Sequence, residues 1–180
     1  MKKSLLIAIV MIATAITANA QRFAYVNTDY ILSNITEYKS AQEQIDKVTA
    51  EWKADVEKKQ KEIDELYRNF QNEQYLLTEE QKKAKIGEIE TKEKAMKEFQ
   101  KSKFGYEGEL FKKRQELVKP IQDKVYEAIE KYAKERGYDF IFDKSSSTTI
   151  LFANPENDKS DEIIKRLGYT PQKNKTTEDK

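Results

Sequence analysis

Carboxylates are the side chains in this sequence best able to supply acid–base chemistry, because histidine and cysteine are both absent. The 32 Asp and Glu residues are scattered along helical sequence, and no pair is singled out by its spacing. Without imidazole or thiol, the chain lacks the usual general base and the usual zinc ligands. None of the five glycines forms a phosphate-binding loop. We therefore expect no enzyme, no cofactor, and no catalytic, cofactor-binding or metal-binding residues.

The charges are numerous but almost balanced. Charged residues make up 36% of the chain, and the formal net charge is +1. This balance is typical of solvated helix surfaces, whereas a nucleic-acid binder carries a basic excess. The cluster Lys112-Lys113-Arg114 fits either a solvated face or an anion site. We expect no nucleic-acid partner.

The first 20 residues have the pattern of a secretory signal peptide. Lys2 and Lys3 precede an apolar run at 5–16, and Ala18-Asn19-Ala20 matches the small-x-small cleavage pattern. We expect cleavage after Ala20 and an exported mature chain, 21–180, without stable membrane insertion. An uncleaved membrane anchor is the alternative.

Residues 37–117 have the pattern of a long antiparallel helical hairpin, which we call the arm. The first helix is predicted to start near Thr36 or Glu37, and its apolar residues recur every three or four positions, apart from one step of seven. This spacing is typical of a coiled-coil seam, with a stutter between Trp52 and Val56. The seam positions are Tyr38, Ala41, Ile45, Val48, Trp52, Val56, Ile63, Leu66 and Phe70.

The second helix of the arm is expected to follow a tip at 72–77. The sequence Thr78-Glu-Glu-Gln81 predicts a capping box at its start. Pro120 predicts a kink or a restart. Gly87, Gly105 and Gly108 are either pivots or tolerated surface residues. Apolar residues at helical spacing are Ile86, Ile89, Met96, Phe99, Tyr106, Leu110, Leu117, Ile121, Val125, Ala128 and Tyr132.

A small β-containing body is expected from 21–36 and 118–168, followed by a disordered tail at 169–180. Its predicted strands are Arg22–Val26, Tyr138–Phe142 and Thr149–Ala153, with Gly137 ending the preceding helix. A short helix should run from Asp158 or Ser160 to Leu167. Large apolar side chains are too numerous for three short strands, so we expect the body to oligomerise. The expected oligomerisation residues are Phe23, Tyr25, Phe140, Phe142, Ile150 and Phe152.

The order of these segments resembles the Skp/OmpH family of periplasmic chaperones. The resemblance covers essentially the whole mature chain. It implies a mainly α fold with a small β body, assembled as a jellyfish-like homotrimer with three helical arms. It also implies an ATP-independent periplasmic holdase that binds unfolded outer-membrane proteins in the cavity between the arms. The segments that carry the resemblance are the signal peptide, Phe23–Leu32, Glu37–Gln42, Val118–Ile121, Gly137–Asp143 and Asp161–Leu167.

The arm departs from the basic arms of well-known family members, since it carries 18 Lys and Arg against 19 Asp and Glu. Client contact should then depend more on apolar side chains, although local packing explains each aromatic residue equally well. A structural or adaptor coiled coil of the cell envelope is the alternative function. Prefoldin also has helical arms, but they come from the chain ends and it is cytosolic. The client-binding candidates are Tyr67, Tyr75, Phe104 and Phe111.

Overall fold

The computed structural model describes residues 21–145 and 150–172. The expected signal peptide, Thr149 of the expected third strand, and tail residues 173–180 lie outside the described residues. The described chain is mainly helical with a small sheet, as predicted. It divides into two compact units, one formed by 35–124 and the other by the segments that flank it.

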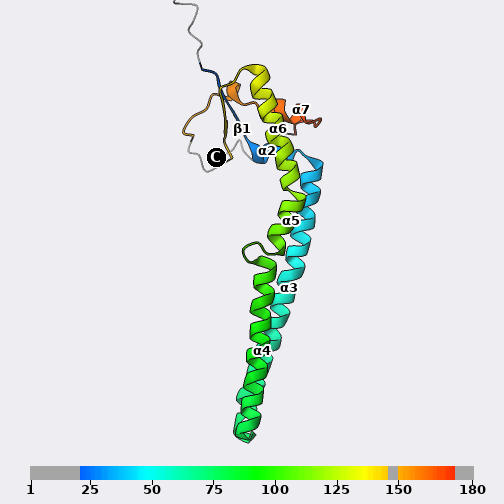
Figure 1. The fold of residues 1–180 in the computed structure, drawn as a ribbon, viewed down its shortest axis with the longest axis vertical. Helices are drawn as coiled ribbons and strands as arrows, with labels where there is room; N and C mark the ends of the chain where they lie inside the picture. Colours follow the sequence, from blue (N-terminus) through cyan, green and yellow to red (C-terminus); the bar gives the residue numbers. More distant parts are fainter. Residues whose placement is uncertain (1–20, 146–149, 173–180) are drawn as a thin grey trace, which may run out of the picture. The chain divides into compact units, whose positions relative to one another are not determined.

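The helical unit, 35–124, is a hairpin in which one long helix runs beside two shorter ones (Figure 1). The first helix starts at Thr36, as predicted, and the tip is a short 3-10 turn. In chain order the elements are α3 (Thr36–Glu73), η1 (Gln74–Leu76), α4 (Glu79–Phe104), α5 (Glu109–Leu117) and the start of α6 (Lys119–Arg136).

The predicted capping box opens α4. The Thr78 hydroxyl accepts the Gln81 backbone N–H at 3.3 Å, and the Gln81 side-chain oxygen accepts the Thr78 N–H at 2.9 Å. Two N–H groups that the helix itself leaves without partners are thereby satisfied. The chain reverses just before this cap, which fixes where the hairpin turns.

The seam between α3 and α4 is narrow and apolar. Ile63, Ile89 and Met96 are buried together, with Leu66 and Phe70 packed against them. This arrangement confirms the predicted apolar stripe in the outer half of the hairpin.

A lysine fills the step of seven positions between apolar residues of the first helix. Lys59 lies between Val56 and Ile63, and its ammonium is 5.3 Å from the centre of the Phe99 ring. A lysine stem can cover apolar surface while its charge rests on an aromatic face. The seam therefore continues through this position without an apolar residue.

The expectation of a continuous second helix is wrong, because α4 ends at Phe104 and a loop precedes α5. Within the loop, Glu107 has a φ of 55°. A Cβ on Gly105 would lie 2.4 Å from the Lys101 carbonyl oxygen, and one on Gly108 would lie 2.9 Å from the Ser102 carbonyl oxygen. Close backbone packing thus requires both glycines.

Two residues assigned to the seam of the second helix lie outside it. Tyr106 is 95% exposed because it falls in the loop, and Ile86 is 41% exposed. Gly87 is a tolerated surface residue, because a Cβ at this position would have no atom within 4 Å.

Pro120 lies in the first turn of α6, just after α5 ends at Leu117. The predicted restart is confirmed, because proline costs little where the N–H has no helical partner.

Among its described residues, the second unit holds a two-stranded parallel sheet instead of the expected three strands. Strand β1 (Phe23–Val26) pairs with β2 (Phe140–Asp143), so that Phe23 lies beside Phe140 and Tyr25 beside Phe142. Helix α2 (Thr28–Ser33) contacts α7 (Ser160–Arg166), and η2 (Pro155–Asn157) lies against β1. The buried apolar residues of this unit are Ala24, Tyr25, Val26, Ile31, Leu32, Val125, Ala128, Tyr132, Ile163 and Ile164.

Residues 150–153 are not a strand, which corrects the prediction for Thr149–Ala153. The free edge of β1 is already used, because the Tyr25 carbonyl accepts the Lys159 N–H at 2.9 Å. The Asn27 N–H beside it donates to the Ser160 hydroxyl, also at 2.9 Å. The apolar segment 150–153 consequently cannot pair with β1 along that edge. Its side chains Leu151 and Phe152 remain exposed.

Polar side chains fix the ends of both strands. Thr28 donates to the Asp143 carboxylate at 2.6 Å, and Ser145 donates to it at 2.8 Å. Burial raises the pKa of Asp143, but these hydrogen bonds outweigh burial and the net pKa is lowered. The ionised Asp143 carboxylate thus ties the end of β2 to the start of α2.

Gly137 has a φ of +66° and ends α6, as predicted for a helix terminus.

Helix α7 starts at Ser160 and has Leu167 as its C-cap, which confirms the predicted short helix, and Gly168 follows with a φ of +90°. Of the tail expected from 169 onward, residues 169–172 are described. The Gln172 N–H donates to the Asn34 side-chain oxygen at 2.7 Å. This contact holds the end of the described chain beside the end of α2.

Candidate functional site

One face of the small sheet is a cluster of stacked phenylalanines. The centroid of the Phe23 ring lies 5.7 Å from that of Phe140 and 6.3 Å from that of Phe142. The parallel register produces this cluster, because residues two apart on a strand share a face. The rings remain 45% (Phe23), 53% (Phe140) and 44% (Phe142) exposed. The sheet therefore presents stacked aromatic rings to its surroundings.

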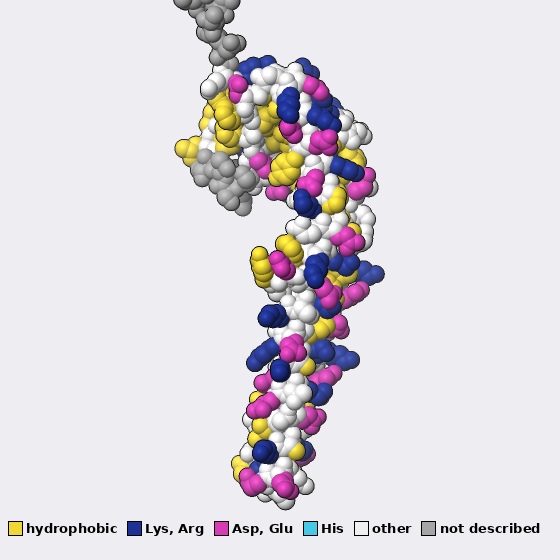
Figure 2. Space-filling view, in the orientation of Figure 1, with side chains coloured by type: hydrophobic (Ala, Val, Ile, Leu, Met, Phe, Trp, Pro, Cys, Tyr) yellow, Lys and Arg dark blue, Asp and Glu magenta, His cyan; other side chains and the backbone are white. Residues whose placement is uncertain are grey.

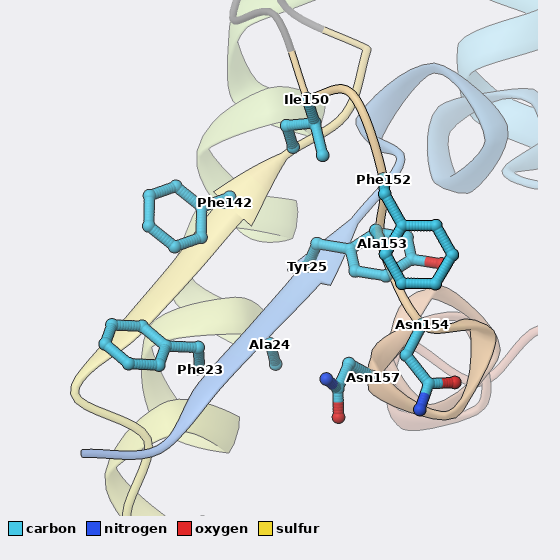
Figure 3. Close-up of a pocket in the computed structure, with 9 residues that line it drawn as sticks. All are labelled: Phe23, Ala24, Tyr25, Phe142, Ile150, Phe152, Ala153, Asn154 and Asn157. Carbon is cyan, nitrogen blue, oxygen red and sulfur yellow. The ribbon is translucent and has the colours of Figure 1, made fainter.

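An open pocket of about 550 Å³ adjoins this cluster (Figure 3). Phe23 and Phe142 enter it from neighbouring strands, while Ile150 and Phe152 come from the segment after β2. Tyr25 also lines it but is buried, and this burial raises the pKa of its phenol. Phe140 is absent from the lining, although it stacks on Phe23. Five of the six expected oligomerisation residues thus line the pocket, and the sixth, Phe140, stacks on one of them.

Sequence reasoning missed Leu151, which neighbours two lining residues in the chain, and the two asparagines of the pocket. Leu151 is 94% exposed between Ile150 and Phe152. Its place in an apolar run was the available signal, but strand alternation directed attention to its neighbours. Asn154 and Asn157 add the polar groups of the pocket. Such a surface can bind apolar groups, and its polar groups are few.

The four aromatic residues proposed for the arm are exposed and separate. Tyr67 lies on α3, Tyr75 on η1, Phe104 at the end of α4 and Phe111 on α5. A hydrogen bond to the Glu93 carboxylate raises the pKa of Tyr67. The structure therefore does not bring them into one site, but spreads them along the arm. Exposed residues that were missed are Leu76 and Tyr106.

A groove of about 410 Å³ lies between α3 and α4. Val56 and Phe104 provide apolar groups, and the ring of Phe104 meets that of Trp52 edge-on at 6.1 Å. Lys53 and Glu57 from α3 and Gln100 from α4 complete the lining, which is mostly apolar. The groove is thus a local apolar site on a charged helical hairpin.

Charges of both signs alternate along the helical hairpin, with apolar side chains among them (Figure 2). Lys85 pairs with Glu73 at 2.6 Å, and Lys92 pairs with Glu62 at 3.6 Å. Partly exposed pairs of this kind contribute little, about 0–1 kcal/mol. At both pairs, a positive and a negative side chain therefore lie next to each other on the surface of the hairpin.

The described residues offer neither a membrane-spanning helix nor a metal site. In 21–145 and 150–172, no helix is both long and apolar enough to cross a membrane. The same residues contain no cluster of three or more side chains able to hold a metal ion.

The fold and its surfaces define a class of protein in which a long helical hairpin accompanies a small sheet with an exposed aromatic face. The sequence profile of the family described as outer membrane protein (OmpH-like) matches residues 22–167. The chain therefore belongs to the OmpH-like family, which confirms the resemblance seen in the sequence.

One solved structure supports the fold. It belongs to a Caulobacter crescentus protein proposed to be an OmpH-like outer membrane chaperone. The TM-score is 0.61, the identity is 9%, and the match covers 88% of this chain and 94% of the other. No curated protein matches this chain significantly.

Proposed function

We propose that this protein is an ATP-independent holdase chaperone of the periplasm, exported by the segment 1–20. Its clients are unfolded outer-membrane proteins, which it keeps from aggregating. Membership of the OmpH-like family supports a chaperone role. The observation that carries the proposal is the spread of exposed aromatic side chains along a hairpin whose charges balance. Such a surface favours many weak, exchangeable apolar contacts over one specific site.

The active form in this proposal is a homotrimer in which the aromatic faces of three sheets meet and the arms surround a cavity. The exposed Phe23, Phe140 and Phe142 support assembly through the body, because a soluble monomer rarely exposes a large apolar patch. Phe152, which lines the adjoining pocket and is 85% exposed, extends the same apolar surface. The resulting assembly would have the jellyfish shape implied by the family.

The function is tested by diluting a urea-unfolded barrel protein into buffer with and without the mature chain. Light scattering should fall as the chain is added, without ATP. A structural or adaptor coiled coil would leave aggregation unchanged. A native mass measurement with and without the client would show whether a trimer holds it.

The four arm aromatics are proposed to grip clients through apolar contact. The Ser variant of Tyr67, Tyr75, Phe104 and Phe111 should bind the unfolded barrel protein more weakly while arm helicity is kept. Exposed ion pairs are screened by salt, whereas apolar contacts are not, so the affinity of the unmodified protein should change little from low to moderate salt. Equal affinity of the Ser variant, or a steep loss with salt, would show that charge carries the grip.

A further inference from the structure

The groove between α3 and α4 combines an apolar lining with polar groups at its border. Val56 and Phe104 offer hydrocarbon surface. Among the described residues, Lys53 and Glu57 form no ion pair, and Gln100 makes no side-chain hydrogen bond. One ammonium, one carboxylate and one amide thus border a mostly apolar groove, and each can still accept a partner.

This set of groups complements a peptide. A peptide backbone offers N–H donors, which the Glu57 carboxylate and the Gln100 amide oxygen can accept. It also offers carbonyl acceptors for Lys53 and the Gln100 amide nitrogen. The opposite charges of Lys53 and Glu57 cancel, so the groove favours neither an anion nor a cation. An acyl chain would use the hydrocarbon surface but none of these donors and acceptors.

We propose that this groove binds a large apolar side chain, preferably an aromatic one, of an extended unfolded polypeptide. The inference rests on the proposed chaperone function and names one place on the hairpin where a client is held. The volume, about 410 Å³, is in the range of pockets that take small ligands, and the groove is open to solvent. An incoming aromatic ring could meet Phe104 either edge-on or in an offset stack, the two arrangements that aromatic pairs favour. Because Lys53, Glu57 and Gln100 are flexible at their ends, the groove accepts different sequences around that side chain.

The chain contains a built-in probe for occupancy. Trp52 is its single tryptophan, and its ring contacts Phe104 at 6.1 Å between centroids. A bromine atom carried into the groove would approach the indole closely and quench its fluorescence. The probe is an unstructured Ser/Thr-rich peptide with p-bromophenylalanine at alternate positions, added to the full mature chain. The same peptide with ordinary phenylalanine is the control.

The brominated peptide should quench Trp52 with a saturable titration, and the control peptide should not. Phe104→Ala should weaken binding about fivefold, the effect of one lost aromatic contact. Gln100→Phe should abolish quenching, because the new ring at an exposed helix position would occupy the groove. Tyr126→Ala removes an exposed aromatic side chain on α6, away from the groove lining, and should leave the titration unchanged. Retained helicity of each variant shows that the hairpin is intact.

If the brominated peptide does not quench Trp52 while the protein still suppresses client aggregation, the groove is not a client-binding site. The proposed chaperone function is unaffected by that result. Failure to suppress aggregation would instead count against the proposed function. Vesicles of brominated phosphatidylcholine provide the lipid arm of the experiment. Quenching by these vesicles and not by the peptide would overturn the peptide assignment in favour of acyl chains.

Discussion

Loss of the aromatic face of the sheet should separate the protein into monomers. A phenylalanine side chain has roughly 200 Å² of surface, and about half of the Phe140 ring remains exposed, so roughly 100 Å² is available for burial. At about 25 cal/mol per Å², Phe140→Ser would remove about 2.5 kcal/mol per subunit from assembly. Over three subunits this is about 7.5 kcal/mol, which raises the concentration for half-assembly of a trimer about 500-fold.

Analytical ultracentrifugation over a concentration series measures this shift. The triple Ser variant of Phe23, Phe140 and Phe142 should be monomeric at every accessible concentration and should also lose sheet structure, since it removes three stacked ring pairs. Phe111→Ser is the matched control, because Phe111 is 45% exposed, as is Phe23, but lies on α5. A fully folded monomer of the unmodified protein at micromolar concentration would refute the reasoning. So would an unchanged mass for the triple variant.

Three further predictions concern the arm and the strand ends. Replacing Val56–Ile89 by a short turn should leave the oligomer intact, because that half of the hairpin buries its own narrow seam; failure to assemble, seen by native mass measurement, would contradict this. Gly87→Ala should raise the free energy of unfolding by about 0.5–1 kcal/mol. Gly105→Ala should lower it by about 1–3 kcal/mol, since its Cβ would lie 2.4 Å from a carbonyl oxygen; denaturant titrations that rank the two variants the other way would disprove the backbone argument. Folding lowers the pKa of the Asp143 carboxyl below its ordinary value of 3.8. The ionised carboxylate therefore stabilises the folded protein fully at pH values above 3.8, and this stabilisation is lost as the pH falls through the lower pKa of the folded state. Asp143→Asn should therefore destabilise the protein at pH 7, and the difference from the unmodified protein should shrink in strong acid; an equal difference at both pH values would count against the hydrogen-bonded carboxylate.

The sequence by itself determined the helical hairpin, because its signals are local. The recurrence of apolar residues predicted the start of α3 at Thr36 and the buried Ile63 and Ile89. The capping box at Thr78, the restart at Pro120 and the helix end at Gly137 depend on a few neighbouring residues each. Short-range backbone chemistry of this kind can be read without knowing what lies across the fold.

Tertiary structure decided the features that depend on distant partners. Residues 150–153 have a strand-like sequence, but residues 158–160 already occupy the free edge of β1. Tyr106 has helical spacing, but two glycines and a close backbone approach place it in a loop. Periodicity reports which side chains could share a face, whereas backbone partners determine whether the element forms.

The candidate surfaces divide in the same way. The types and spacing of Phe23, Phe140 and Phe142 indicated an apolar face, and only the parallel register of two strands 117 residues apart brought their rings together. The groove of Val56 and Phe104 could not be predicted, because its partners come from opposite sides of the hairpin. Local sequence sets which side chains are available. The packing of segments far apart in the chain decides which of them meet and which stay exposed, because the free energy that selects those contacts comes from burial shared between the segments.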